Sequence, residues 1–173
     1  MPIKHVEGNL LDFPSNTNVI CHCCNTLGGV FGAGIAKQIA EEYPVALEED
    51  ILAAKEKRNV LGGFSGVRLS NGKMIINLYG QAEVGIGKRR LDYEAIYCAL
   101  EALKDKLEQA HTEGRIYHLG IPYGIGCGLA GGAWSIVEAM IKDLFENSPV
   151  NVTIVKLKQK NLDNPAKSAR LNP

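Results

Sequence analysis

The chain has 173 residues, 46% of them apolar, which is enough for one globular domain with its own hydrophobic core. Lysine and arginine together number 19, and so do aspartate and glutamate, so the charge balance argues against a general surface for nucleic acids or other polyanions. No apolar run is long enough to cross a membrane, and five cysteines without a signal peptide predict reduced thiols and a cytoplasmic location.

Strand-like and helix-like segments alternate in the first third of the chain. Strands are predicted at residues 3–7 and 18–24, and the second is apolar enough to be a buried strand. A glycine-rich turn leads into a helix at residues 34–43. Pro44 then opens a further helix that reaches about residue 58, because proline fits the first helical turn.

The alternation continues to the last predicted strand. Asn71-Gly72 lies between the apolar runs 64–69 and 74–79, and Asn-Gly in that position predicts an antiparallel hairpin. Asp92 is placed to cap a long helix that reaches about residue 110. The remaining predicted elements are a strand at 116–122, a helix at 134–147 and a strand at 150–157.

This order of elements predicts an α/β fold with a central mixed, mostly parallel sheet between helices. One domain is expected over residues 1–157. From residue 158 to 173 the chain is polar and contains Asn164-Pro165, which is typical of a C-terminal tail without a core to join.

Two glycine-rich loops each follow a predicted strand and run into a helix. The first loop is residues 25–34, Asn-Thr-Leu-Gly-Gly-Val-Phe-Gly-Ala-Gly, and the second loop is residues 124–132, Gly-Ile-Gly-Cys-Gly-Leu-Ala-Gly-Gly. Glycine lets the main chain approach a ligand, and free N–H groups at a helix N-terminus favour an anion. Either loop alone could be a tight turn that only packs. Together, beyond the carboxyl ends of strands, they predict a phosphate site.

Cys21 and Cys24 have the spacing of a zinc or redox motif. Their place in an apolar strand, with no second cysteine pair to complete a site, favours small core residues instead. No metal is expected.

The two loops resemble those of the macro domain family. Val19-Ile20-Cys21-His22-Cys23-Cys24-Asn25, with Gly28-Gly29 and Gly32-Ala33-Gly34, is similar to that family's first ligand loop. Ile121-Pro122 with Gly124-Ile125-Gly126-Cys127-Gly128-Leu129 and Trp134 resembles its second, and Glu7-Gly8-Asn9-Leu10-Leu11 resembles its opening strand. The resemblance spans residues 3–157 and implies a three-layer α/β/α domain. It is greatest to the ADP-ribose 1″-phosphate phosphatase branch and the related branch that removes terminal ADP-ribose from glutamate.

The resemblance implies an ADP-ribose ligand and no cofactor. Gly8, Asn9 and Leu10 are expected near adenine, with Asn9 in place of the more usual aspartate. The other expected ligand residues are Gly28, Gly29, Val30, Phe31, Gly32, Ala33 and Gly34 in the first loop, and Pro122, Tyr123, Gly124, Ile125, Gly126, Cys127, Gly128 and Leu129 in and before the second. Tyr79, Tyr123 and Trp134 are alternative candidates for the aromatic that packs on adenine.

The expected catalytic residues are His22 and Asn25. The aspartates and the lysine that other branches of the family use are replaced here by Phe31, Ala130 and Gly80-Gln81. His22 could donate a proton to the leaving ribose oxygen or orient a water molecule, while Asn25 fixes the distal ribose. The alternative for His22 is a buried histidine satisfied by the backbone.

The resemblance therefore predicts slow, metal-independent hydrolysis of ADP-ribose 1″-phosphate to ADP-ribose and phosphate. One alternative is a non-catalytic module that binds ADP-ribose. The other is a hydrolase that removes ADP-ribose from modified protein or nucleic acid, so that ADP-ribosylated macromolecules would be partners. The chain is expected to be a monomer.

Overall fold

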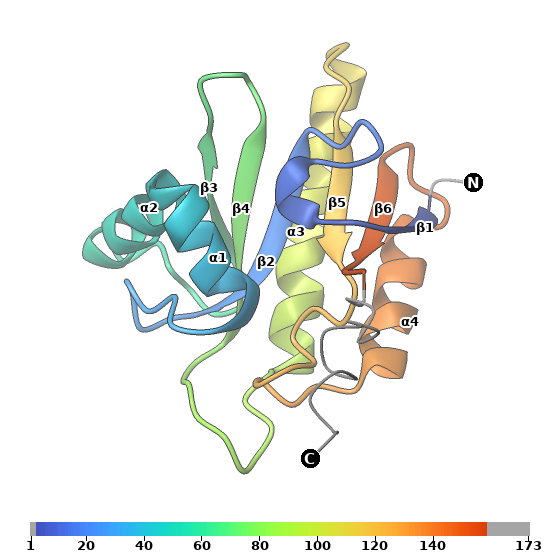
Figure 1. The fold of residues 1–173 in the computed structure, drawn as a ribbon. Coiled ribbons are helices and arrows are strands. Elements are labelled where there is room, and N and C mark those ends of the chain that lie inside the picture. Colours follow the sequence, from blue (N-terminus) through green and yellow to red (C-terminus); the bar gives the residue numbers. More distant parts are fainter. Residues whose placement is uncertain (1–2, 159–173) are drawn as a thin grey trace, which may run out of the picture.

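A six-stranded sheet forms the centre of the structure, a computed structural model that describes residues 3–158 (Figure 1). The strands are β1 (Ile3–Glu7), β2 (Val19–Asn25), β3 (Phe64–Arg68), β4 (Met74–Gln81), β5 (His118–Pro122) and β6 (Asn151–Lys156), and they lie in the order β1-β6-β5-β2-β4-β3. All neighbouring pairs are parallel except β3 and β4. The predicted mixed, mostly parallel sheet and its Asn-Gly hairpin are confirmed.

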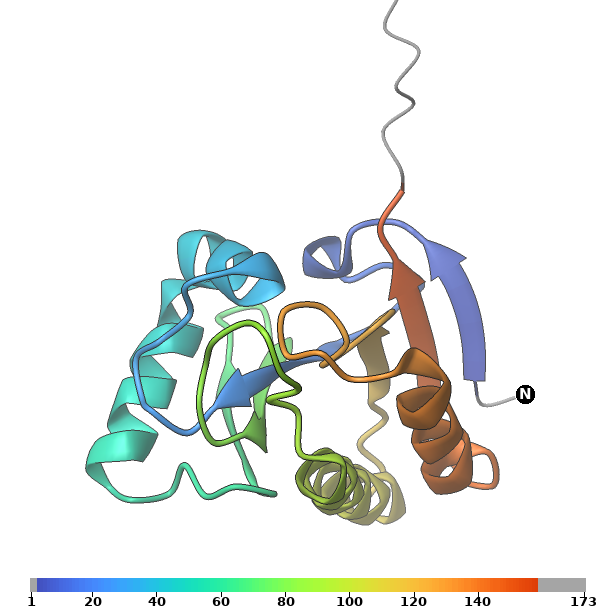
Figure 2. The same cartoon turned by 90° about the horizontal axis from the view of Figure 1, so that it is seen from below.

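Helices cover both faces of the sheet, as Figure 2 shows from one end. The helices α1 (Gly34–Glu42) and α2 (Pro44–Lys55) lie on one face, and α3 (Tyr93–Thr112) and α4 (Trp134–Phe145) lie on the other. Asp92 caps α3 as predicted, because its side chain accepts a hydrogen bond from the N–H of Ala95. Within residues 3–158, no helix is both long and apolar enough to span a bilayer.

A short 3-10 helix, η1 (Leu10–Asp12), was not predicted and follows β1 directly. The side chain of Asn9 accepts a hydrogen bond from the N–H of Leu11, which starts this turn. The predicted C-terminal tail, apart from Lys158, lies outside the described residues.

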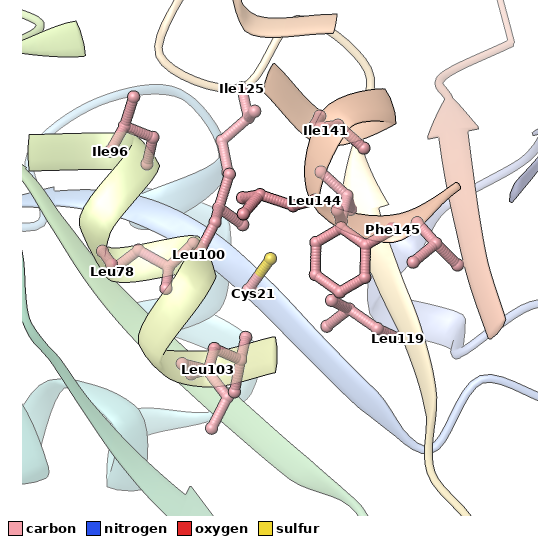
Figure 3. Packing of buried hydrophobic residues seen from close by; sticks show 14 of the residues in the cluster. Cys21, Leu78, Ile96, Leu100, Leu103, Leu119, Ile125, Ile141, Leu144 and Phe145 are labelled. Atoms are coloured by element: carbon pink, nitrogen blue, oxygen red, sulfur yellow. The ribbon is translucent and has the colours of Figure 1, made fainter. Parts of the chain in front are cut away.

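Two hydrophobic cores lie on the two faces of the sheet. Cys21 and Leu119 pack under α3 and α4 with Leu103 and Phe145 (Figure 3). Alternate residues of β2 point to the opposite face, where Ile20 packs under α1 and α2. Because β2 is buried on both faces, its whole sequence is apolar or tightly hydrogen-bonded, as expected for a central parallel strand.

The chain changes face between two neighbouring strands. After β2 it passes to α1 on one face, and after β5, which pairs with β2, it passes to α4 on the other face. Loops that leave adjacent strands in opposite directions open a crevice at the carboxyl edge of a sheet. The two glycine-rich loops are these two connections.

Candidate ligand-binding site

A cavity of about 610 Å³ lies at this carboxyl edge. The two glycine-rich loops, η1 and the connection from β4 to α3 surround it, and Figure 2 looks toward the end of the sheet where these segments meet. The predicted ligand residues that line it are Gly8, Asn9, Leu10, Asn25, Val30, Phe31, Gly32, Ala33, Gly34, Pro122, Tyr123, Gly124, Ile125, Gly126, Gly128 and Leu129. The volume is within the range of small-molecule sites.

No charged side chain lines the cavity in the part of the chain that the structure describes. The polar side chains among its lining residues are the amides of Asn9, Asn25, Gln38 and Gln81, the hydroxyl of Tyr123, and two thiols. Burial raises the pKa of the Cys23 thiol to about 12 and that of the Cys24 thiol well above its usual value, so both are neutral at physiological pH. Within the described residues no group of three or more His, Cys, Asp or Glu side chains could hold a metal ion.

The second loop offers main-chain N–H groups to the cavity. Its turns use the N–H of Ile125, which donates to Pro122 O at 3.0 Å, and that of Cys127, which donates to Gly124 O at 2.8 Å. The alternating N–H groups of Gly126 and Gly128 have no partner among residues 3–158. Gly126 has a φ of +71°, and a Cβ there would lie 2.8 Å from the Leu91 side chain, so glycine is required. Such a row of free donors is an anion-binding arrangement.

The first loop ends at the N-terminus of α1. Ala33 occupies the N-cap position without a side-chain cap, and the first helical residues Gly34, Ile35 and Ala36 line the cavity. Lys37 makes the first main-chain hydrogen bond of the helix, to Ala33 O. The three N–H groups before it therefore lack an intrahelical acceptor and carry the positive end of the helix dipole.

Asn25 lines the cavity, and both ends of its amide brace the first loop. Its Nδ2 donates to Val30 O at 3.0 Å, and its Oδ1 accepts from the N–H of Leu27 at 3.0 Å. These bonds hold the loop in an arc, because they join residues two and five positions further along the chain. Asn25 therefore shapes the wall of the cavity.

The expected adenine end is also assembled. Gly8, Asn9 and Leu10 lie together at the cavity, and Asn9 Oδ1 keeps a second lone pair beside its bond to Leu11. Of the three aromatic candidates only Tyr123 lines the cavity. The ring centroid of Trp134 lies 4.7 Å from that of Tyr123, whereas Tyr79 is completely buried.

Three predicted ligand residues do not line the cavity. Gly28 packs against α2, where a Cβ would lie 2.5 Å from the Ala54 side chain, and Gly29 donates its N–H to Asp50. Cys127 donates its Sγ–H to Ile125 O. The glycine pattern could not separate residues that face a ligand from residues that face a helix.

His22, the predicted proton donor, also lies outside the cavity. Its side chain is fully buried, its Nε2 lies 2.7 Å from Asn77 Oδ1, and the Phe31 ring packs against it in a T-shaped contact. Burial lowers its pKa to about 4 despite the hydrogen bond to Asn77. The structure does not support direct contact between His22 and a ligand, and the buried-histidine alternative describes its position, with a side chain rather than the backbone as its partner.

The wall formed by the connection from β4 to α3 was not predicted from the sequence. Gln81, Val84, Gly85 and Ile86 line the cavity there, and Ile86 is 78% exposed. The connection is tied to the second loop, because the N–H of Arg90 donates to Ala130 O at 2.7 Å. The parallel pairing of β4 beside β2 was the signal that could have placed Gln81 at this edge. Val155 and Leu157, at and just after the end of β6, also line the cavity and were not predicted, because the order of the strands in the sheet was not known from the sequence.

The chain is similar to several characterised proteins along most of its length. It is 27% identical to human "ADP-ribose glycohydrolase OARD1" over 90% of this chain and 91% of that protein. It is also 27% identical to the "ADP-ribose 1″-phosphate phosphatase" of Candida glabrata, over 90% and 98% of the two chains. A macrodomain protein from Streptomyces coelicolor matches its fold with a TM-score of 0.69 at 25% identity, over 91% and 99% of the two chains.

No family model matches the chain. The full-length relatives, the shared fold and the cavity between two strand-to-helix loops nevertheless agree on one class of protein. In sequence and in fold, the chain is similar to macro domain proteins.

Proposed function

We propose that the chain binds ADP-ribose in this cavity and releases phosphate from ADP-ribose 1″-phosphate. The observation that carries the proposal is a cavity with free main-chain N–H groups on two sides and no charged side chain among its described residues. Adenine would lie at Asn9 and Leu10, the diphosphate at Gly126 and Gly128, and the distal ribose beside Asn25.

Main-chain donors suit this ligand because hydrogen bonds to a charged phosphate oxygen contribute about 1.5–3 kcal/mol each. Several such bonds can hold a diphosphate without a lysine or arginine. Gly34 and Ile35 line the same cavity, and their N–H groups, which lack an intrahelical acceptor, would meet a phosphate attached at the distal ribose.

The hydrolysis part of the proposal is supported by the names of two relatives and by these same donors. Water would attack phosphorus and the bond between phosphorus and the 1″ oxygen would break. The proton that the water loses would go to the leaving ribose oxygen, which gives ADP-ribose and phosphate, and main-chain N–H groups would stabilise the charge on the phosphoryl oxygens. No described side chain at the cavity is placed as a general acid or base. We therefore expect slow turnover.

The test combines calorimetry with ADP-ribose and a phosphate-release assay on ADP-ribose 1″-phosphate. Gly126→Ala should weaken ADP-ribose binding at least about tenfold, because the new Cβ would displace the second loop from Leu91. Gly72→Ala is the matched control: Gly72 also has a positive φ, of +86°, but it lies in the hairpin turn, where an added Cβ would have no neighbour within 4 Å. Failure of the parent protein to bind ADP-ribose would end the proposal.

A non-catalytic ADP-ribose-binding module is the second candidate. The burial of His22 favours it, since the residue expected to carry the chemistry does not reach the cavity. Binding of ADP-ribose without phosphate release, and without release of ADP-ribose from a modified peptide or oligonucleotide, would select this candidate. Release from the peptide or oligonucleotide alone would select the third alternative, a hydrolase of ADP-ribosylated macromolecules.

A further inference from the structure

A network of hydrogen-bonded, buried polar side chains lies under the first loop, and the proposed function does not use this network. Its members are His22 on β2, Ser65 on β3, Asn77 and Tyr79 on β4, and Asp50 on α2. All five are almost completely excluded from solvent, and Asp50 is only 1% exposed. A buried carboxylate is costly unless its oxygens accept hydrogen bonds, so its partners indicate what it does.

The hydrogen bonds that join the members of this network are donated in one direction, toward Asp50. Asp50 Oδ1 accepts from the Tyr79 hydroxyl at 2.8 Å, so the Ser65 hydroxyl, 2.8 Å from Tyr79, must donate to Tyr79 in turn. Asn77 donates its Nδ2 to Ser65 Oγ at 3.1 Å and presents its Oδ1 to His22 Nε2 at 2.7 Å. His22 therefore carries its proton on Nε2, and each hydrogen bond between successive members from His22 to Asp50 is donated toward Asp50. Asn77 Nδ2 also donates to Ala46 O at 3.1 Å.

Asp50 and His22, at the two ends of this network, both contact the first loop. Asp50 Oδ2 accepts the main-chain N–H of Gly29 at 2.7 Å, and the His22 ring supports the Phe31 ring with centroids 5.0 Å apart. The two attachment points flank Val30, and Val30 and Phe31 both line the cavity. Gly28, just before the first attachment point, lies against Ala54 of α2.

We propose that Asp50 is a positioning residue, and that the buried hydrogen-bond network that ends at Asp50 fixes the first loop in its ligand-binding shape. If the Gly29 peptide rotated away, Asp50 would lose a donor inside the core, so the loop is held before any ligand arrives. A loop held in its bound shape loses less conformational freedom on binding. What the loop binds rests on the proposed function, but its attachment to Asp50 does not.

Two substitutions at Asp50 separate hydrogen bonding from mere packing. In Asp50→Asn the amide oxygen can accept from Gly29 while the amide nitrogen donates to the Tyr79 oxygen and the Tyr79 hydroxyl turns to Ser65. We expect ADP-ribose affinity within about threefold of the parent. Asp50→Ala has no acceptor, and we expect at least about a tenfold loss of affinity. Leu103→Ala, in the core on the opposite face, is a matched control for lost stability.

The ligand-independent measurement is hydrogen exchange of the Gly29 amide, followed by NMR. We expect protection in the parent, in Asp50→Asn and in Leu103→Ala, and fast exchange in Asp50→Ala. If Asp50→Ala does not fold, Tyr79→Phe replaces it in the test. This variant removes one hydroxyl from the buried network, and it should speed Gly29 exchange and weaken binding.

The proposal is overturned if Gly29 stays protected and affinity stays within about twofold of the parent in Asp50→Ala, or in Tyr79→Phe where that variant replaces it. It is also overturned if Leu103→Ala loses as much affinity as Asp50→Ala. A parent protein that does not bind ADP-ribose refutes the proposed function alone, since Gly29 exchange still reports the attachment.

Discussion

The rings of Phe31 and His22 pack in a T-shaped contact, with centroids 5.0 Å apart and ring planes at 82°. Phe31 lines the cavity, and His22 does not. Phe31 therefore lies between the cavity and His22, which is fully buried. A residue that could titrate near neutral pH is thereby kept uncharged.

Acid should destabilise the fold through His22. Its pKa is about 4 in the folded protein against an ordinary 6.5, so the unfolded chain binds the extra proton between these values. The contribution of neutral His22 to the free energy of unfolding is therefore fully present above pH 6.5 and is lost as the pH drops toward 4. The loss is roughly 3 kcal/mol, at about 1.4 kcal/mol per pKa unit. Urea unfolding of the parent and His22→Gln across this range measures the effect. The variant should show a smaller fall, and parallel curves would contradict the prediction.

Phe31→Ala should raise the pKa of His22. The substitution removes the ring that covers the imidazole, so water can reach it and the penalty on its charged form decreases. NMR titration of the His22 ring measures this directly, with Tyr123→Ala, which alters the cavity wall away from His22, as the control. We also expect a loss of stability of about 2–4 kcal/mol, since Phe31 is only 7% exposed. An unchanged His22 pKa would show that Phe31 is not its cover.

Asn9→Asp should strengthen ADP-ribose binding by roughly threefold to tenfold, because a carboxylate is a better acceptor than an amide for an adenine amino group. The same substitution keeps the acceptor that Leu11 uses at the start of η1. Asn9→Ala loses both interactions and should cost about 1 kcal/mol of stability as well as affinity. Calorimetry with ADP-ribose ranks the three proteins. Equal affinities would remove Asn9 from the ligand site.

Alkylation should distinguish Cys23 at the cavity from Cys98 at the surface. Burial raises the pKa of Cys23 to about 12, whereas Cys98 is exposed on α3. At pH 8 only about one in ten thousand Cys23 side chains is a thiolate, the reactive form. Mass spectrometry after brief treatment with iodoacetamide should therefore find Cys98 modified and Cys23 intact. Rapid modification of Cys23 would show that the base of the cavity is open to water.

The sequence by itself determined the elements of this protein and their approximate ends. Hydrophobic runs, Pro44, Asp92 and the Asn71-Gly72 turn predicted each main strand and helix, because these signals act within a few residues of the chain. The α2 helix ends at Lys55, three residues before the predicted end at about residue 58. The two loops that meet at the cavity were also predicted, since their glycines precede helices.

Only the tertiary structure decided which residues of those loops face the cavity. Gly28 and Gly29 turn toward α2, and Gly126 and Gly128 turn toward the cavity, although all four belong to similar glycine-rich sequences. The difference depends on Ala54 and Asp50, which are far away in the sequence but adjacent in space. The burial of His22 has the same cause, because its environment is made by Phe31 and Asn77 from other segments. Local signals determine the path of the main chain, whereas exposure and charge depend on what packs against each side chain.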